Sequence, residues 1–430
     1  MKIPEILMVE TVHQPGSLAK VLQVIADAGL VIEHISAVRR EQGRTLWEIT
    51  LEMDEQADQS LYARIDALPT AQFLGKSDRV FNRHRGGKIE MKARLPINTL
   101  QVLRDVYTPG VARVCLAIKA DPERVYEYTN LGHTVAIVTN GTAILGLGDI
   151  GPLAGLPVME GKSALFASLV DLTGIPILLT EKDPDRVVEL IMGIEQSFGA
   201  IQLEDFAAPH CFAIEDQLRA RLNKPVLHDD QHGTAVVALA ALLNAARRVG
   251  RNLEQSVVGQ IGLGAAGLGI VRLLRAHGVG RVLGADRNPD AFVRLAALGG
   301  VASTIEGIMA EADIVIATTG VRGLIRPELV RPGQIILALS NPDPEIEPIV
   351  ALEHGAAFAA DGKGINNVLG FPGLFRGALE ARATCFTDAM LMAAAAAIAA
   401  RAPGHDLVPD PLDREVHAAV TAAVRAAVEA

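Results

Sequence analysis

The sequence is poor in cysteine and in aromatic residues. Among its 430 residues only three are cysteines, and phenylalanine, tryptophan and tyrosine together make up 4%. Cys115, Cys211 and Cys385 lie far apart, and an odd number of cysteines without CxxC spacing does not suit a disulfide framework. We therefore expect the chain to work in a reducing compartment, the cytoplasm.

An excess of positive charge is also missing. Lysine and arginine number 40 against 50 acidic residues, which gives a formal net charge of -10. Broad surfaces for nucleic acids or anionic membranes need clustered basic residues, so we expect neither partner. The long apolar run at residues 389–400 is shorter than the ~20 residues that span a bilayer, and it predicts a buried helix. Residues 1–10 contain no uninterrupted apolar segment of the kind that a targeting peptide has.

The length and the apolar content, 50% of all residues, predict two or three domains with ample cores. The first part has the order βαββαβ, with strands expected near residues 5–12, 31–40 and 45–53 and helices near 17–29 and 58–68. With Pro15 and Gly16 in the first loop, this module resembles an ACT domain. The resemblance implies binding of an amino acid or another small effector, or dimerisation without a ligand. Residues 81–96 are basic and aperiodic, which is typical of a linker.

Four short apolar runs in the next part each end in polar residues, and helical stretches separate the later ones. They lie at residues 133–139, 175–180, 200–205 and 225–230. This alternation predicts a parallel sheet, and ligands of such sheets sit beyond the carboxyl ends of the strands. Four acids fall at these ends: Glu204, Asp205, Asp229 and Asp230. Like charges so close together can all stay ionised around a divalent cation, and oxygen ligands select Mg²⁺ or Mn²⁺. The alternative for each pair is a solvated turn or a helix N-terminus.

A dinucleotide-binding motif follows in its proper context. Gly262, Gly264 and Gly267 have GxGxxG spacing between an apolar strand and a helix, and the next strand ends at Asp286. The glycines allow the backbone to approach a pyrophosphate, whose charge is stabilised by the helix N-terminus. Asp286 would accept the ribose 2′-hydroxyl, which favours NAD. Arg287 could instead pair with the 2′-phosphate of NADP, so both cofactors stay open.

Seven motifs occur in the order found in bacterial malic enzymes. They are VYTPGVARVC, ILGLGDIGPLAGLPVMEGKSALF, AIQLEDFAAPHCF, LHDDQHGTAVV, GLGAAG, ALSNP and GINNVLGFPGLFRGALEARAT. The resemblance covers roughly residues 88 to 400. It implies oxidative decarboxylation of L-malate to pyruvate with NAD or NADP and a divalent metal, Mg²⁺ or Mn²⁺. The expected fold is α/β, with an ACT-like module at residues 1–82, a malic enzyme catalytic domain at 88–235 and a Rossmann-type domain with C-terminal helices at 236–430.

The resemblance also assigns roles to residues of this sequence. The implied metal ligands are Glu204, Asp205 and Asp230, and the implied catalytic residues are the acid Tyr107, the base Lys162 and its partner Asp229. Three asparagines complete the set: Asn341 and Asn367 resemble the family's substrate and nicotinamide contacts, and Asn366 lies beside them. We assign Asn341 to the cofactor and the other two to the substrate.

Two features of the sequence bear on the mechanism. We expect Lys162 at the start of a helix, where the positive end of the helix dipole favours the neutral amine, and Tyr107 beside it as the acid that protonates C3. Larger malic enzymes clamp a malate carboxylate with an arginine at the position of Ala143. The asparagines, or an arginine or lysine from a facing subunit of a homodimer or higher homo-oligomer, are candidates to replace it.

Two other functions stay open. A malolactic enzyme would use the same site, keep the cofactor bound and release lactate. A catalytically silent sensor of NAD and metabolites would use the ACT-like module as its working part, but it would have no need of the complete set of catalytic and metal-binding residues.

Overall fold

The computed structural model describes residues 3–53, 60–341 and 343–429. The chain divides into two compact units, residues 1–88 and 89–430, each of which is described by itself below. The α/β class predicted from the sequence is confirmed in both units. The predicted domain boundaries stay predictions, and the one between residues 235 and 236 lies within a single helix, α10 (Asp229–Arg248).

Unit 1 is an antiparallel sheet with helices packed on it. Its elements are β1 (Ile3–Val12), α1 (Ser17–Asp27), β2 (Ile32–Glu41), β3 (Arg44–Met53), α2 (Ser60–Asp66), β4 (Ala71–Lys76) and α3 (Arg79–His84). The strand order is β2-β3-β1-β4, so the predicted βαββαβ arrangement is confirmed. Alternate apolar residues of the central strands, such as Leu7 and Ile49, meet Val21 and Ile25 of α1 in the core. The predicted linker at residues 81–96 is wrong at its start, because α3 continues to His84.

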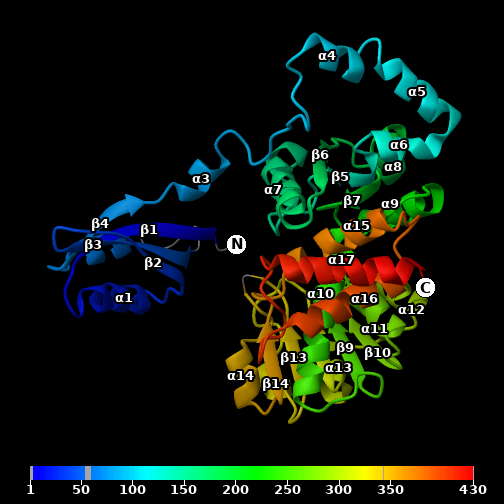
Figure 1. Cartoon of the computed structure of the whole chain (residues 1–430). Helices are drawn as coiled ribbons and strands as arrows, with labels where there is room; N and C mark the ends of the chain where they lie inside the picture. Colours follow the sequence, from blue (N-terminus) through cyan, green and yellow to red (C-terminus); the bar gives the residue numbers. More distant parts are fainter. Residues whose placement is uncertain (1–2, 54–59, 342, 430) are drawn as a thin grey trace. The chain divides into compact units, whose positions relative to one another are not determined.

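Unit 2 begins with three helices that have no buried residues, and a parallel sheet follows them. The elements are α4 (Leu100–Val106), α5 (Val111–Ala120), α6 (Val125–Tyr128), β5 (Thr134–Thr139), α7 (Pro152–Val170), β6 (Thr173–Leu178), α8 (Pro184–Ile194), β7 (Ala200–Leu203), α9 (His210–Arg221), β8 (Val226–His228) and α10. The sheet order is β6-β5-β7-β8, and all its strand pairs are parallel, as the strand and helix alternation predicts. None of the residues of α4, α5 and α6 is buried, and Figure 1 shows α4 and α5 standing away from this sheet.

The second half of unit 2 is a six-stranded parallel sheet. Its elements are β9 (Val257–Ile261), α11 (Ala265–Ala276), β10 (Arg281–Ala285), α12 (Pro289–Ala297), β11 (Val301–Ala302), α13 (Ile305–Glu311), β12 (Ile314–Ala317), β13 (Ile335–Ala338), α14 (Pro348–Glu353) and β14 (Phe358–Asp361). The order β11-β10-β9-β12-β13-β14 reverses between β9 and β12, which is the doubly wound topology whose crevice binds dinucleotides.

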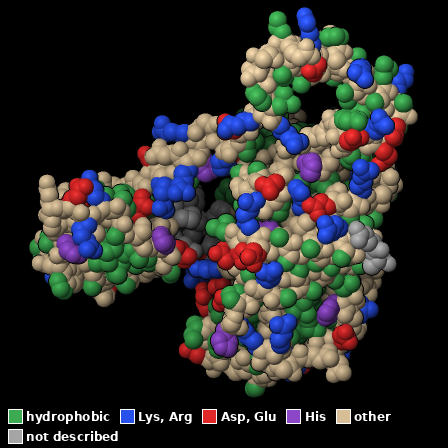
Figure 2. Space-filling view, viewed as in Figure 1, with side chains coloured by type: hydrophobic (Ala, Val, Ile, Leu, Met, Phe, Trp, Pro, Cys, Tyr) green, Lys and Arg blue, Asp and Glu red, His purple; other side chains and the backbone are tan. Residues whose placement is uncertain are grey.

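Three further helices complete unit 2: α15 (Phe371–Glu380), α16 (Asp388–Arg401) and α17 (Arg414–Glu429). The apolar run at residues 389–400 lies within α16 and buries Leu391, Ala394 and Ile398, so the prediction of a buried helix is confirmed. One helix of the described residues, α7, is long and apolar enough to cross a membrane. It packs on β5 and β6 and carries a buried lysine, which identifies it as a core helix. In Figure 2 side chains of both charges are interspersed over the visible face.

An aromatic cluster fixes α7 against α15. The ring of Phe166 meets the rings of Phe371 and Phe375 edge to face, with centroids 5.0 Å and 5.5 Å apart. All three side chains have no exposed surface. Because edge-to-face aromatic pairs add to the free energy gained by burial, this cluster holds α7 firmly in place.

We expect Phe166→Ala to lower the free energy of unfolding by about 3–5 kcal/mol, because a large buried ring leaves a cavity that the neighbouring rings cannot fill. Phe81→Ala is the matched control, since that ring is 74% exposed. Denaturant unfolding followed by circular dichroism measures both variants. Equal losses for the two variants would contradict the role of the aromatic cluster.

Candidate active site

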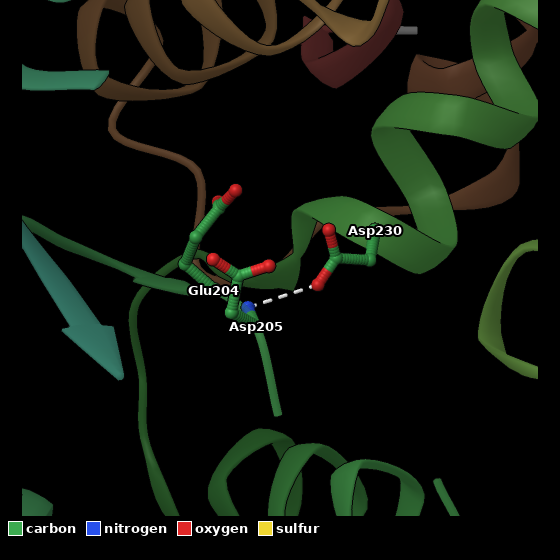
Figure 3. A group of neighbouring side chains, drawn as sticks. All are labelled: Glu204, Asp205 and Asp230. Atoms are coloured by element: carbon green, nitrogen blue, oxygen red, sulfur yellow. Dashed lines mark hydrogen bonds between the residues drawn. The ribbon is translucent and has the colours of Figure 1, made fainter. Parts of the chain in front are cut away.

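Acidic side chains gather beyond the carboxyl ends of β7 and β8. Glu204 and Asp205 directly follow β7, and Asp230 lies in the first turn of α10. Each offers a carboxylate oxygen, and these atoms all lie within 4.8 Å of one another. Figure 3 shows the three side chains converging from the two chain segments. Parallel strands bring their carboxyl ends to one edge, which is why residues 25 positions apart meet here.

The backbone at Asp205 is shaped for this contact. Its φ is 56°, in the left-handed region that aspartate tolerates better than most residues. The Asp205 N–H donates a hydrogen bond to Asp230 Oδ2 at 2.9 Å, drawn in Figure 3, and the Asp205 carbonyl accepts one from the N–H of Ala143 at 3.0 Å. Ala143 therefore supports the acidic turn through its backbone N–H. This is the position at which larger family members are expected to have an arginine.

Burial makes this cluster unfavourable without a cation. Burial, and next the charge of Asp230, raise the pKa of Asp205 to about 7. Burial also raises the pKa of Glu204, which is only 2% exposed. The buried Oδ2 of Asp205 has no hydrogen-bond partner among the described residues. Three hard oxygen donors with an unsatisfied buried oxygen suit Mg²⁺ or Mn²⁺, so these residues fit the metal that the sequence predicts.

Lys162 lies at the centre of the charged groups, although not where the sequence predicted it. It is in the middle of α7, which begins at Pro152, so the dipole at the helix N-terminus does not act on it. Its ammonium donates to Asp229 Oδ2, lies 3.0 Å from Glu204 Oε1 and stands 4.4 Å from the centre of the Phe371 ring. Burial acts to lower the pKa of Lys162, but the two carboxylates outweigh it and raise that pKa. The predicted depression of this pKa is therefore wrong for the metal-free chain.

Sequence reasoning missed a second layer of residues that holds the acids in place. Glu215 on α9 is 3% exposed and accepts hydrogen bonds from the N–H of His228 at 3.1 Å and from His232 Nε2 at 2.9 Å. These two histidines flank Asp229 and Asp230 in the sequence. The Glu215 carboxylate therefore holds the turn that carries both acids from both sides. Burial opposes ionisation of Glu215, yet the two histidines lower its pKa to about 2.

The strand before the acids contributes a further support. Gln202 is a fully buried residue of β7, and its Nε2 donates to Glu204 Oε2 at 2.6 Å. A polar residue within the apolar run AIQL was a signal that the sequence offered. The contacts of Glu215 had no comparable signal, because its two partners lie 13 and 17 positions away, on β8 and on α10.

The predicted substrate asparagines lie beside the acidic turn. A Cβ on Gly233 would come within 1.9 Å of Asp229 Oδ1 and 3.5 Å of the Cβ of Asn367, which places that asparagine next to α10. Asn366 caps the short 3-10 helix η5 (Asn367–Leu369), where its Oδ1 accepts from the N–H of Val368 at 3.0 Å. Asn341 follows β13 and donates to the carbonyl of Gly362 at 3.1 Å.

Tyr107 is not brought to this site within one chain. It caps the C-terminal end of α4 and is 67% exposed. Among the described residues, no hydrogen bond or ring contact joins it to Lys162, whose neighbours are Asp229, Glu204 and Phe371. The expectation of an adjacent ammonium that holds the phenol is therefore not met within a single copy.

The glycine motif lines a pocket of about 550 Å³ at the carboxyl ends of β9, β10 and β12. Gly262 has a φ of +90°, and a Cβ there would lie 2.7 Å from the carbonyl oxygen of Thr318. A Cβ on Gly267 would lie 1.9 Å from the carbonyl oxygen of Gly262, so the helix can approach the strand only without a side chain. Nothing lies within 4 Å of a Cβ on Gly264, which leaves its surface open at the N-terminus of α11. These residues fit a dinucleotide cofactor.

Asp286 and Arg287 both line this pocket. Asp286 Oδ2 accepts from the N–H of Leu263 at 2.7 Å, and Oδ1 accepts from the N–H of Asn288 at 2.8 Å. These bonds fix the carboxylate at the mouth of the glycine loop. Among the described residues, the guanidinium of Arg287 has no comparable hydrogen bond or ion pair that fixes it.

Comparisons with known proteins agree with the geometry. Residues 86–219 match the model of the malic enzyme N-terminal domain, and residues 6–70 match the ACT domain. The chain is 53% identical to NAD-dependent malic enzyme 1 of Bacillus subtilis, over 97% of this chain and 96% of that protein. It is 40% identical to the bifunctional malic/malolactic enzyme of the same organism, over 80% and 90%. The solved malic enzyme of Pyrococcus horikoshii has a TM-score of 0.78 and 37% identity, over 82% of this chain and 90% of that one.

We expect Asp205→Asn to stabilise the metal-free protein in a pH-dependent way. The pKa of Asp205 is about 7 in the fold and about 3.9 in an unfolded chain, so ionisation costs the native state stability as the pH rises between these values. The gain from asparagine should grow from pH 4 to 7, reach about 1–3 kcal/mol and stay constant above pH 7. Thermal unfolding in a chelator across this pH range measures it.

The same variant should bind Mn²⁺ about tenfold more weakly or worse, because a hard cation loses an anionic ligand. Asp290→Asn, which changes an exposed carboxylate in the first turn of α12, is the matched control for both measurements. Unchanged Mn²⁺ affinity in Asp205→Asn would remove this residue from the metal site.

Proposed function

The chain belongs to the malic enzyme family, and from that premise we propose which residues carry its reaction. The reaction is the oxidative decarboxylation of L-malate to pyruvate and CO₂, with NAD or NADP as the hydride acceptor. The observation that carries the proposal is the position of Lys162 between Asp229 and the three acids, Glu204, Asp205 and Asp230.

Glu204, Asp205 and Asp230 would hold the divalent cation. When bound there, Mg²⁺ or Mn²⁺ supplies Lewis-acid polarisation of the oxygen on C2 of the substrate. Asn366 and Asn367 lie beside the same turn and would position the carboxylates of malate. The Phe371 ring over Lys162 and the burial of the acids keep water from the reacting atoms.

Lys162 is the base that takes the proton of the C2 hydroxyl. In the metal-free chain two carboxylates hold it as an ammonium. A cation held by Glu204 would weaken the attraction of that carboxylate for Lys162 and would favour the neutral amine. Asp229, whose own pKa is raised by burial, is placed to accept the ammonium proton and leave a neutral amine.

One incubation distinguishes the candidate functions. The protein is supplied with L-malate, Mn²⁺ and either NAD or NADP, and both the reduced cofactor and the acid product are followed. Pyruvate in step with NADH or NADPH supports the malic enzyme reaction. Lactate without net reduction of the cofactor would support the malolactic reaction, which the bifunctional relative of Bacillus subtilis makes relevant. Binding of NAD without turnover would leave only a sensor.

We expect a higher kcat/KM with NAD than with NADP. Asp286 lies at the mouth of the glycine loop, where its charge would repel a 2′-phosphate and its oxygens would accept the 2′-hydroxyl. Initial rates at saturating malate and Mn²⁺ measure the ratio, and Arg287→Ala is the companion variant, which should lower only the residual NADP activity. A preference for NADP in the wild type would show that Arg287 dominates.

We propose a homodimer whose sites use residues of both copies, and the exposed segment with Tyr107 supports this proposal. Apolar side chains of α4 and the stretch before it are exposed, including Leu100 at 72% and Ile97 at 56%. In Figure 2 the segment that Figure 1 labels α4 and α5 leaves an open gap to the rest of unit 2. A second copy would cover these side chains. Tyr107 of the first copy would then lie next to Lys162 of the second copy. The phenol would then protonate C3 after CO₂ leaves.

A heterodimer of Tyr107→Phe and Lys162→Ala chains tests this arrangement. If Tyr107 acts in the partner's site, one of the two sites contains both natural residues, and activity should return to about half of the wild-type value. Two differently tagged chains, expressed together and purified through both tags, give the heterodimer. Activity no higher than that of either parent homodimer would place Tyr107 in the site of its own chain.

The enzyme is proposed to be cytoplasmic.

Unit 1 is proposed to bind a small effector. Unit 1 has its own core and matches the ACT domain, so residues 89–430 should keep malate oxidation and lose the response to that effector. Kinetics of both proteins with a panel of amino acids and small metabolites measure this. A folded but inactive remainder would make unit 1 part of the active site. Identical kinetics across the panel would favour a module for dimerisation alone.

A further inference from the structure

Among the described residues, one fully buried carboxylate lies outside the candidate active site. Glu345 has no exposed surface and lies seven positions after the end of β13. None of the motifs read from the sequence gave it a role. A buried carboxylate is costly unless several donors surround it, so its contacts indicate what it does for the fold.

Glu345 joins the loops that follow two neighbouring strands. Its Oε1 accepts hydrogen bonds from the N–H and the Oγ1 of Thr319, at 2.6 Å and 2.8 Å, just after β12. The same oxygen accepts from Ser340 Oγ at 2.5 Å, and Oε2 accepts from the Ser340 N–H at 3.4 Å, just after β13. The two loops are joined again by the N–H of Gly320, which donates to Ser340 Oγ at 2.8 Å.

These loops form one wall of the dinucleotide pocket. Thr318, Thr319, Val321 and Leu324 line the cavity, and the carbonyl of Thr318 packs against the position of Gly262. Glu345 also fixes this wall through its backbone, because its carbonyl accepts from the N–H of Ile325 at 3.0 Å. The loop after β13 continues from Ser340 into Asn341, the residue assigned to the cofactor. One side chain therefore sets the spacing between the wall of the pocket and the start of the cofactor-contacting loop.

We propose that Glu345 is a positioning residue for the cofactor, which holds the loops after β12 and β13 at the separation that the dinucleotide needs. The inference rests on the proposed function, because it takes the pocket at the glycine motif as the NAD site. Glu345 does not touch the cofactor in this arrangement. Its four hydrogen bonds reduce the freedom of both loops before binding, which raises affinity by preorganisation.

Gln334 offers a matched control at the other end of the same strand. It directly precedes β13, is 1% exposed, and its Nε2 donates to the carbonyls of Met309 and Ala312 at 3.0 Å and 2.8 Å. Gln334→Leu therefore breaks a comparable set of buried hydrogen bonds away from the pocket. A role of Glu345 in stability alone would make the two variants alike.

The test measures binding of NADH to the full chain by its fluorescence, without malate or metal. Glu345→Gln keeps the size of the side chain but turns an NH₂ group toward the donors of Thr319 or Ser340. We expect its Kd for NADH to rise about tenfold or more, and that of Gln334→Leu to stay unchanged. At saturating NAD the kcat of Glu345→Gln should stay close to the wild-type value, so that the defect lies in KM for the cofactor.

Ser340→Ala keeps the inference testable if Glu345→Gln does not fold, because it removes only the hydroxyl bonds and should raise the Kd about threefold. Equal Kd values for the wild type, Ser340→Ala and any folded Glu345 variant would overturn the inference while leaving the NAD site in place. The same rise in Gln334→Leu would also overturn it. A wild type that does not bind NADH would overturn the proposed function and the inference with it.

Discussion

The contact of a buried ammonium with two carboxylates is the constraint on which the rest of the site depends. Lys162 lies between Asp229 and Glu204 in an interior where an isolated charge would be very costly. The ammonium offsets only one of the two carboxylates, and Asp205 and Asp230 add further negative charge to the same small volume. A divalent cation would offset most of this negative charge, so the residues that suit the chemistry are also those that make the metal-free protein less stable.

The fold brings the parts of the site together through close backbone approaches. The N-terminal turn of α10 carries two of the acids, and α11 starts at the glycine motif of the cofactor pocket. These two helices touch where a Cβ on Gly269 would come within 2.3 Å of the carbonyl oxygen of Gln231. The helix proposed to bind the cofactor and the helix whose first turn is proposed to bind the metal are thus in direct contact. The aromatic cluster on α7 holds the third component, Lys162, against them.

The rule that ligands of parallel sheets lie beyond the carboxyl ends of the strands predicted from the sequence where the acids of the site lie. Glu204, Asp205 and Asp230 each follow or adjoin an apolar run, and the carboxyl ends of parallel strands share one edge. The predicted position of Lys162 at the start of its helix was wrong. Gly155, Pro157 and Gly161 interrupt the helical pattern before it in the sequence, yet tertiary packing stabilises a helix through them. The contacts of Glu215 and Glu345 could not be read from the sequence, because they depend on loops and helices that meet only in the fold. Tyr107 is exposed in one chain, and its proposed place in the site of a second copy could not be read from a pattern in one sequence.

The most direct test of the account compares two reactions of Lys162→Ala. If this residue is the base for oxidation, the variant should lose malate oxidation by about 10²–10⁴-fold and retain a much larger fraction of its oxaloacetate decarboxylation. Oxaloacetate already has a carbonyl at C2, so its decarboxylation does not need removal of the hydroxyl proton. Both rates are measured at saturating Mn²⁺ and cofactor. Loss of the two activities in the same proportion would contradict the account, because Lys162 would then serve only to hold the acidic cluster together.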